Sequence, residues 1–354
     1  MHKFCVFCGN KPRQKNVEHV IPQWLIELTG NPKREAIVGP FWNDKKEQLE
    51  TSRIPFDQFG FPACDECNNK FSNLEAEAKR IVEAFLQRLP LSANDFSTFL
   101  TWLDKVRIGI WLGAYYLHRK VSDIEPHMFI GDRIDKTDRL VFIYRSDSKI
   151  KRLTFLGTMT PAFQYLPSCF TLLVDNFAFF NAASDFLISK HLGLPYPRKV
   201  SWYEWPKLVF TLVPGKEHAA LPLVRSKFDP HCTQIYQPMF ARAATRSAGL
   251  DWYGTDYVKS IAADVTNGIG KVFMCKGQSL EEYPDQPSLS WEPTTMHDDS
   301  KLGRATAVQT LKLQVYLTNH GPNLSGLEPE RREIVREQLR LARDFNRNLI
   351  QRLS

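Results

Sequence analysis

Four of the seven cysteines form two pairs with the same spacing, and this spacing suits a bound metal ion. The pairs are Cys5 with Cys8 and Cys64 with Cys67, and each is a C-x-x-C turn whose backbone N–H groups face the sulfurs. Four thiolates complete the tetrahedral shell that Zn²⁺ prefers. A closed site of this kind is structural and leaves catalysis to other residues. We therefore predict a structural zinc ion held by these four cysteines.

Two other interpretations of the cysteines stay open. The two pairs are unrelated, or one of them is a redox C-x-x-C, although the βαβ context of a thioredoxin-like motif is missing. The other cysteines, Cys169, Cys232 and Cys275, are scattered, so the set does not read as a disulfide framework and favours a reducing compartment. The N-terminus lacks the apolar core of a signal peptide, and no stretch approaches the ~20 apolar residues of a membrane span. We expect a cytoplasmic protein without a membrane partner.

A second set of residues lies beside the cysteine pairs. The segment Glu18-His19-Val20-Ile21-Pro22 follows the first pair, and Asn68-Asn69 directly follows the second. A lone Glu-His pair is weak evidence for an active site, but the order C-x-x-C, E-H-V-I-P, C-x-x-C-N is a far more specific signal. In this order, over about residues 3–75, the chain resembles the HNH (ββα-metal) endonuclease superfamily, and in particular its members with a C-x-x-C zinc frame. The resemblance implies a ββα fold in which a strand carries Glu18 and His19 and a helix begins near Cys67.

The residue types fit the chemistry that the resemblance implies. Phosphodiester hydrolysis needs an activated water, a cation near the leaving oxygen and in-line geometry. A histidine titrates near neutrality, which suits His19 as the general base. Glu18 and Asn68 offer hard oxygen ligands for Mg²⁺ or Mn²⁺, with Asn69 as a rival of Asn68. Neighbouring strand residues point to opposite faces, so Glu18 and His19 both serve only if the strand end is twisted or the metal lies at its edge.

The sequence departs from the family pattern in two ways. The middle Asn of the HNH name has no clear match between His19 and Cys64, where Asn31 and Asn43 are the candidates. The long spacing also implies an insertion at residues 27–55, which contacts a nucleic-acid backbone or, as the default, is a structural loop. Its basic and aromatic residues are Lys33, Arg34, Trp42, Lys45, Lys46 and Arg53.

The 354 residues suit several domains, and we predict an α+β protein in three parts. Residues 1–75 form the zinc-stabilised ββα-metal module, and residues 76–124 a helical hairpin linker. Residues 125–354 form a larger mixed α+β region that targets, senses or binds a partner.

Periodicity and turn residues predict the elements of these parts. The expected helices are Asn73–Leu89, Ser92–Arg119 with a capping box at Ser92 and Asp95, Asp185–His191 and Glu330–Leu353. The expected strands are Leu140–Tyr144, Leu153–Leu156, Phe170–Val174, Leu208–Val213 and Lys271–Cys275, in a mostly antiparallel or mixed sheet. The Pro- and Ser-rich segment Glu281–Gly303 is predicted to be an exposed loop.

The formal net charge of +7 comes from the middle of the chain. Residues 149–250 contain 12 lysines and arginines against 5 acidic residues, which fits either a nucleic-acid partner or a solvated basic surface. We expect DNA more than RNA as the substrate, because no RRM or KH signature occurs. An activating ligand or protein partner is expected for the C-terminal region, as in a restriction or anti-phage defence effector, by analogy alone. The alternatives are an RNA-cleaving HNH nuclease and a non-catalytic zinc module that binds nucleic acid or protein.

Overall fold

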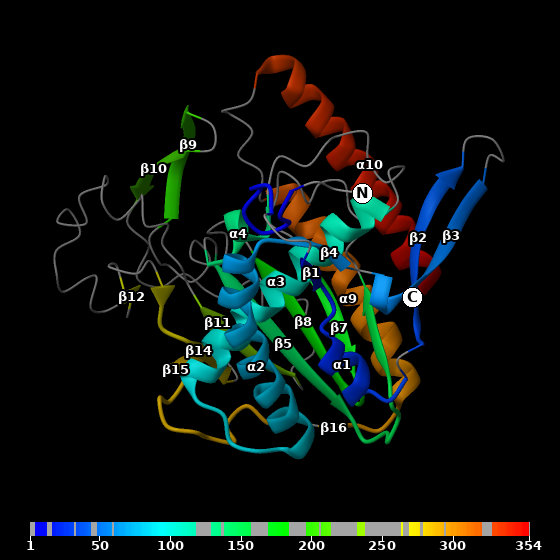
Figure 1. Ribbon diagram of the computed structural model, residues 1–354, viewed down its shortest axis with the longest axis vertical. Helices are drawn as coiled ribbons and strands as arrows, with labels where there is room; N and C mark the ends of the chain where they lie inside the picture. The colour runs from blue at the N-terminus through cyan, green and yellow to red at the C-terminus, as the bar shows by residue number, and fades with distance from the viewer. Residues whose placement is uncertain are drawn as a thin grey trace.

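The protein, seen in a computed structural model, combines helices and strands, as expected for the α+β class (Figure 1). The structure describes residues 4–12, 16–31, 33–43, 48–58, 60–117, 129–135, 138–156, 169–183, 196–204, 207–213, 232–237, 263–264, 269–276, 279–293, 295–320 and 328–353. Within these ranges, no helix is long and apolar enough to cross a membrane.

The N-terminal part contains short elements followed by one long helix. Its elements are β1 (Asn16–His19), α1 (Gln23–Leu28), β2 (Glu35–Asn43), β3 (Gln48–Pro55), the 3₁₀ helix η1 (Phe56–Gln58), β4 (Gly60–Ala63) and α2 (Asp65–Gln87). β1 pairs antiparallel with β4, with His19 opposite Gly60. The Asn16 side chain of β1 donates a hydrogen bond to Asp65, the first residue of α2. The strands β1 and β4 and the helix α2 therefore lie side by side, and they follow one another in this order along the chain.

The insertion between β1 and β4 contains a β-hairpin. β2 and β3 pair antiparallel, with a register irregularity between Val38 and Phe41. In Figure 1 this hairpin extends away from the central sheet. The structure does not describe Lys45 and Lys46, so their predicted contact with nucleic acid lies outside the described residues.

Helices α2 and α3 (Ala93–Leu117) pack against each other. α2 begins before Asn73, where periodicity placed its start, and close to Cys67, where the resemblance placed it. The capping box of α3 is confirmed: the Ser92 backbone N–H donates to Asp95 Oδ2 at 2.7 Å, and the Asp95 backbone N–H donates to Ser92 Oγ at 3.2 Å. Each carboxylate or hydroxyl oxygen satisfies an N–H at the helix start that has no partner within the helix.

A mostly antiparallel sheet forms the centre of the C-terminal part. Its strands are β5 (Arg139–Ser146), β6 (Leu153–Leu156), β7 (Cys169–Val174), β8 (Phe177–Ala183), β11 (Thr233–Gln237), β14 (Phe273–Lys276), β15 (Ser279–Glu282) and β16 (Thr295–Met296). The strand order is β15-β14-β11-β5-β8-β7-β6, and β16 adds a short parallel pairing to β5. The other described elements are α4 (Ile130–Arg133), the strand pairs β9 (Tyr196–Glu204) with β10 (Lys207–Val213) and β12 (Ala263–Asp264) with β13 (Ile269–Gly270), and the helices α9 (Asp299–His320) and α10 (Pro329–Leu353).

The side chains of β5 alternate between two hydrophobic clusters, one on each face of the sheet. Val141 and Ile143 belong to the cluster that also contains the buried residues of α2 and α3. Leu140, Phe142 and Tyr144 belong to a cluster that includes residues of α9. Because successive strand residues point to opposite faces, one central strand separates two cores. The result is three layers, with α2 and α3 on one face of the sheet and α9 on the other, where α10 packs against α9 (Figure 1).

The larger cluster crosses both predicted domain boundaries. It contains Phe7 near the N-terminus, Phe99 in α3 and Phe179 in β8. The division at residues 75 and 124 stays a prediction, and packing is continuous across both positions.

The predicted elements that lie within the described residues agree with the structure in type, with one exception. All five expected strands and the C-terminal helix are present; the strand Leu153–Leu156 has the expected ends, and the other elements have shifted ends. The exposed loop predicted for Glu281–Gly303 is wrong in part, because β16 lies within this segment, α9 begins at Asp299, and Trp291 is fully buried. The centroid of its indole lies 4.8 Å from that of the Phe85 ring. The Pro- and Ser-rich composition of the segment does not indicate this buried contact. The helix expected at Asp185–His191 lies outside the described residues.

We predict that Phe85→Ala lowers the free energy of unfolding by about 3–5 kcal/mol, the usual cost of truncating a buried aromatic side chain. Phe85 is fully buried and its ring contacts rings of α3, β8 and Trp291. Denaturant unfolding monitored by circular dichroism measures the loss. The control is Leu89→Ala, which removes a side chain that is 45% exposed and is expected to change stability by less than about 0.5 kcal/mol. Equal effects of the two substitutions would contradict the layered packing.

Candidate metal centre

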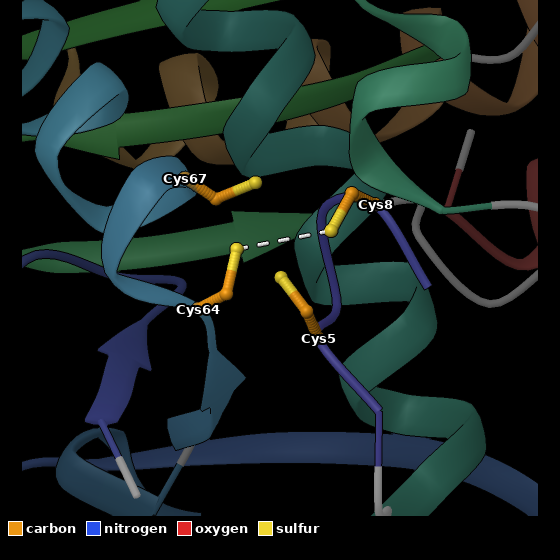
Figure 2. A group of neighbouring side chains, drawn as sticks. All are labelled: Cys5, Cys8, Cys64 and Cys67. Atoms are coloured by element: carbon orange, nitrogen blue, oxygen red, sulfur yellow. Dashed lines mark hydrogen bonds between the residues drawn. The ribbon is translucent and has the colours of Figure 1, made fainter. Parts of the chain in front are cut away.

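The four paired cysteines converge on one point, although residues 8 and 64 are far apart in the sequence. Their sulfur atoms all lie within 4.8 Å of one another, as Figure 2 shows. The Cys8 and Cys64 sulfurs are 3.8 Å apart. A tetrahedral zinc ion with Zn–S bonds of about 2.3 Å places its sulfurs about 3.8 Å apart, so this distance fits one edge of a zinc site. A disulfide needs about 2.05 Å, and the structure has all four as free cysteines.

The first pair lies in a tight turn that the backbone fixes. The Gly9 backbone N–H donates to the Cys5 carbonyl at 2.9 Å, and the Cys5 N–H donates to the Asn10 carbonyl at 2.8 Å. Gly9 has a φ of +76°, a conformation that favours glycine. A Cβ at Gly9 would also lie 2.2 Å from the Phe129 ring, so a side chain would displace the segment that follows α3.

The second pair lies at the start of α2. Cys64 is the residue that precedes the helix, and Cys67 is in its first turn, where the Asn68 N–H donates to the Cys64 carbonyl at 2.9 Å. The turn of the first pair is joined to β4, because the Val6 N–H donates to the Pro62 carbonyl at 2.9 Å. The cluster therefore fastens the N-terminal turn to the junction of β4 and α2.

The electrostatics of the cluster require a cation once the thiols ionise. Burial opposes ionisation of Cys5, but backbone N–H groups of Cys64, Cys8 and Phe7 outweigh it and lower the pKa of this thiol. Burial, the Cys64 side chain and the charge on Cys5 raise the pKa of the Cys67 thiol. Thiolates this close repel one another unless a metal neutralises them, and a coordinated thiol is deprotonated. The four cysteines can therefore hold a metal ion such as zinc, and in the described part of the chain they form the one cluster of Cys, His, Asp and Glu donors of this kind.

The structure places Glu18 and His19 on β1, whose first residue, Asn16, contacts the start of α2. Both side chains are half-buried. The Nδ1 atom of His19 is buried and has no hydrogen-bond partner in the described structure. A buried polar atom without a partner is costly in a folded protein, and a bound ligand, ion or water is one way to satisfy it. Gly60, opposite His19 on β4, brings no side chain to this position.

Glu18 is engaged by a residue that the sequence analysis missed. The ammonium of Lys105 on α3 forms ion pairs with Glu18 and with Glu75 of α2. The indoles of Trp24 and Trp102 donate to Glu75 Oε2 at 2.9 and 3.1 Å. The signal in the sequence was a lysine within an apolar helix, which must find an anionic partner if the helix is buried.

The predicted site residues Asn68 and Asn69 lie near the N-terminal end of α2. Asn68 is half-buried and Asn69 is exposed, and the choice of Asn68 over its rival stays a prediction. A divalent-metal site held by Glu18 and Asn68, with His19 as the general base, stays a prediction.

Three of the candidates within the insertion, Asn31, Arg34 and Arg53, have structural partners. The Asn31 side chain accepts a hydrogen bond from the Lys33 backbone N–H at 3.0 Å and so orders the turn before β2. The Arg34 guanidinium donates to the Thr29 carbonyl at 2.7 Å, and Arg53 lies 3.7 Å from Glu35. Arg34 therefore has a structural role, which supports the default interpretation of the insertion at this position.

Comparisons with protein-family models, with curated proteins and with solved structures gave no match to the chain. The residues and their geometry therefore carry the functional conclusion.

We predict that the purified chain contains about one zinc ion per molecule and that Cys67→Ser loses it, because a hydroxyl is a poor replacement for a thiolate ligand. Elemental analysis measures the zinc, and thermal unfolding of the variant is expected at lower temperature than that of the wild type. Cys169→Ala is the matched control, since Cys169 is buried in the other hydrophobic cluster, and it is expected to keep its zinc. Full zinc content in Cys67→Ser would contradict the four-cysteine site.

Proposed function

We propose that the protein is a metal-dependent endonuclease of the HNH type that hydrolyses phosphodiester bonds of DNA. The observation that supports the proposal is the connection between β1, the strand of Glu18 and His19, and the start of α2, which follows Cys64 and contains Cys67 and Asn68. The cysteine cluster and the hydrogen bond from Asn16 to Asp65 support this connection. The motif order of residues 3–75 supports the reaction type.

The chemistry assigned to each residue follows from its type. His19 takes the proton of the attacking water as the new P–O bond forms, and the leaving nucleotide oxygen gains a proton from solvent. Glu18 and Asn68 would hold Mg²⁺ or Mn²⁺, which supplies positive charge to the phosphate and the leaving oxygen. The buried Nδ1 of His19 has no hydrogen-bond partner in the described structure, so this nitrogen does not commit the imidazole to a structural hydrogen bond.

The second candidate function is a non-catalytic zinc module that binds nucleic acid or protein. The ion pair between Glu18 and Lys105 favours it, since a carboxylate with a structural partner can be explained without a metal. This candidate expects bound zinc without metal-dependent cleavage.

The C-terminal region is proposed to control the nuclease, through an activating ligand or a protein partner, in restriction or anti-phage defence. The continuous core that joins the sheet, α3 and the N-terminal part supports a physical connection between the two regions. Cleavage of every duplex without preference by the isolated chain would count against such control.

We predict that zinc-replete protein nicks or linearises supercoiled plasmid with Mg²⁺ or Mn²⁺, and that His19→Ala is slower by about 10²–10⁴-fold, the usual contribution of a general base. Gel electrophoresis of time courses measures the rate, and EDTA is expected to stop the reaction. His297→Ala is the matched control, because this histidine is 91% exposed, is paired with Asp147, and lies outside the N-terminal part.

The outcomes separate the candidates. Equal cleavage by wild type and His19→Ala would show that His19 is not the base. Absence of cleavage with DNA, followed by cleavage of single-stranded RNA, would change the substrate and keep the mechanism. Absence of cleavage with both substrates, at full zinc content and with Mg²⁺ and Mn²⁺ supplied, would point either to the non-catalytic module or to a missing activator of the C-terminal region.

A further inference from the structure

Lys105 is the most deeply buried amine beside the proposed active site. Its side chain is 1% exposed, and its ammonium lies between Glu18 of β1 and Glu75 of α2, whose side chains are each 14% exposed. One turn further along α3, Gly109 allows close approach, because a Cβ there would lie 2.7 Å from Val20, the residue after His19. The same face of α3 therefore contacts the end of β1 through Lys105 and Gly109.

The charge of Lys105 is maintained by its two partners. Both carboxylates form ion pairs with the buried ammonium and compensate for its lost hydration. One cation between two carboxylates leaves a net charge of about −1 in a largely buried place. Such a residual negative charge favours a further cation nearby.

The surrounding side chains fix the position of the ammonium. It lies 5.6 Å from the ring centroid of Phe7 and 5.9 Å from that of Phe71, within the range of cation–π attraction. Phe7 lies between the two cysteines of the first pair, and its ring stacks on Phe71 with centroids 4.3 Å apart. The turn of Cys5 and Cys8, β1, α2 and α3 therefore meet at this one amine.

We propose that Lys105 is a positioning residue of the divalent-metal site: it holds Glu18 through Oε1, so that Oε2 is left to bind the metal, and Glu75 keeps Lys105 in place. This inference rests on the proposed function. A ligating carboxylate is commonly held by a second hydrogen-bonding partner, which limits its motion and tunes its affinity for the ion. Lys105 is buried away from solvent, so it acts through Glu18 and does not touch the nucleic acid.

The test uses a double variant, because removal of Lys105 alone would leave two buried carboxylates and would destabilise the fold. Lys105→Met combined with Glu75→Gln removes one positive and one negative charge, and so keeps the net charge of the cluster. Mn²⁺ binding to the full, zinc-replete chain is measured by electron paramagnetic resonance titration. The dissociation constant for Mn²⁺ is expected to rise by about 10–100-fold, the usual effect of losing such a partner, while zinc content is unchanged.

Three further proteins complete the experiment. Wild type is expected to bind Mn²⁺, and Glu18→Gln is expected to lose this binding. Arg80→Gln is the matched control, because Arg80 pairs with Asp95 and so also joins α2 to α3. The Arg80 side chain is 52% exposed and does not contact Glu18. It is expected to bind Mn²⁺ as wild type does.

Each outcome decides one question. Wild-type affinity in the folded double variant would overturn the positioning role and leave the metal site intact. Tighter binding in the double variant would also overturn it, because Lys105 would then compete with the metal for Glu18. Absence of Mn²⁺ binding by wild type, or equal binding by Glu18→Gln, would overturn the metal site of the proposed function and with it this inference.

Discussion

The middle of helix α3 is buried on every side, and the rest of the structure is arranged around it. Every residue from Trp102 to Gly113 is buried, including Asp104, Lys105 and Arg107. A helix that is apolar around its whole circumference is stable in water only when other elements cover all of its faces. The N-terminal elements and α2 cover one side of α3, and the sheet covers the other.

The charged residues of α3 show how its two sides differ. Lys105 pairs with the carboxylates of β1 and α2, whereas the Arg107 guanidinium pairs with Asp104 at 2.8 Å and donates to Asn181 of β8. Buried charges persist only when partners compensate for the lost hydration. These neighbouring positions therefore fasten the proposed active site and the central sheet to the same helix, which gives the C-terminal region a direct structural connection to Glu18.

The cysteine cluster meets a different need, because the N-terminal elements are short. β1 and β4 have four residues each, and short strands with few apolar side chains hold together poorly on their own. Metal binding by Cys5, Cys8 and the cysteines of α2 would join the chain end to the helix start and supply the stability that a small core lacks. The cluster and α3 thus hold β1 from two directions.

The sequence by itself determined the elements that have local signals. The C-x-x-C spacing predicted the four-cysteine cluster, apolar periodicity predicted α2, α3 and α10, and Ser92 with Asp95 marked the start of α3. β8 was missed because its residues follow β7 across a turn at Asp175 and Asn176, so that two strands read as one interrupted apolar run. The Asp-Asn pair between apolar runs was the available signal.

The tertiary structure decided the contacts between residues that are distant in the sequence. Lys105 contacts Glu18, which lies 87 positions earlier in the sequence, and Trp291 packs on α2 within the core. Neither contact produces a periodicity or a residue spacing that can be recognised in the sequence. Periodicity reports which face of an element is apolar, but it does not report which partner covers that face. For this reason the residue types of the proposed site were evident from the sequence, whereas the lysine that holds one of them became visible only when α3 was placed beside β1.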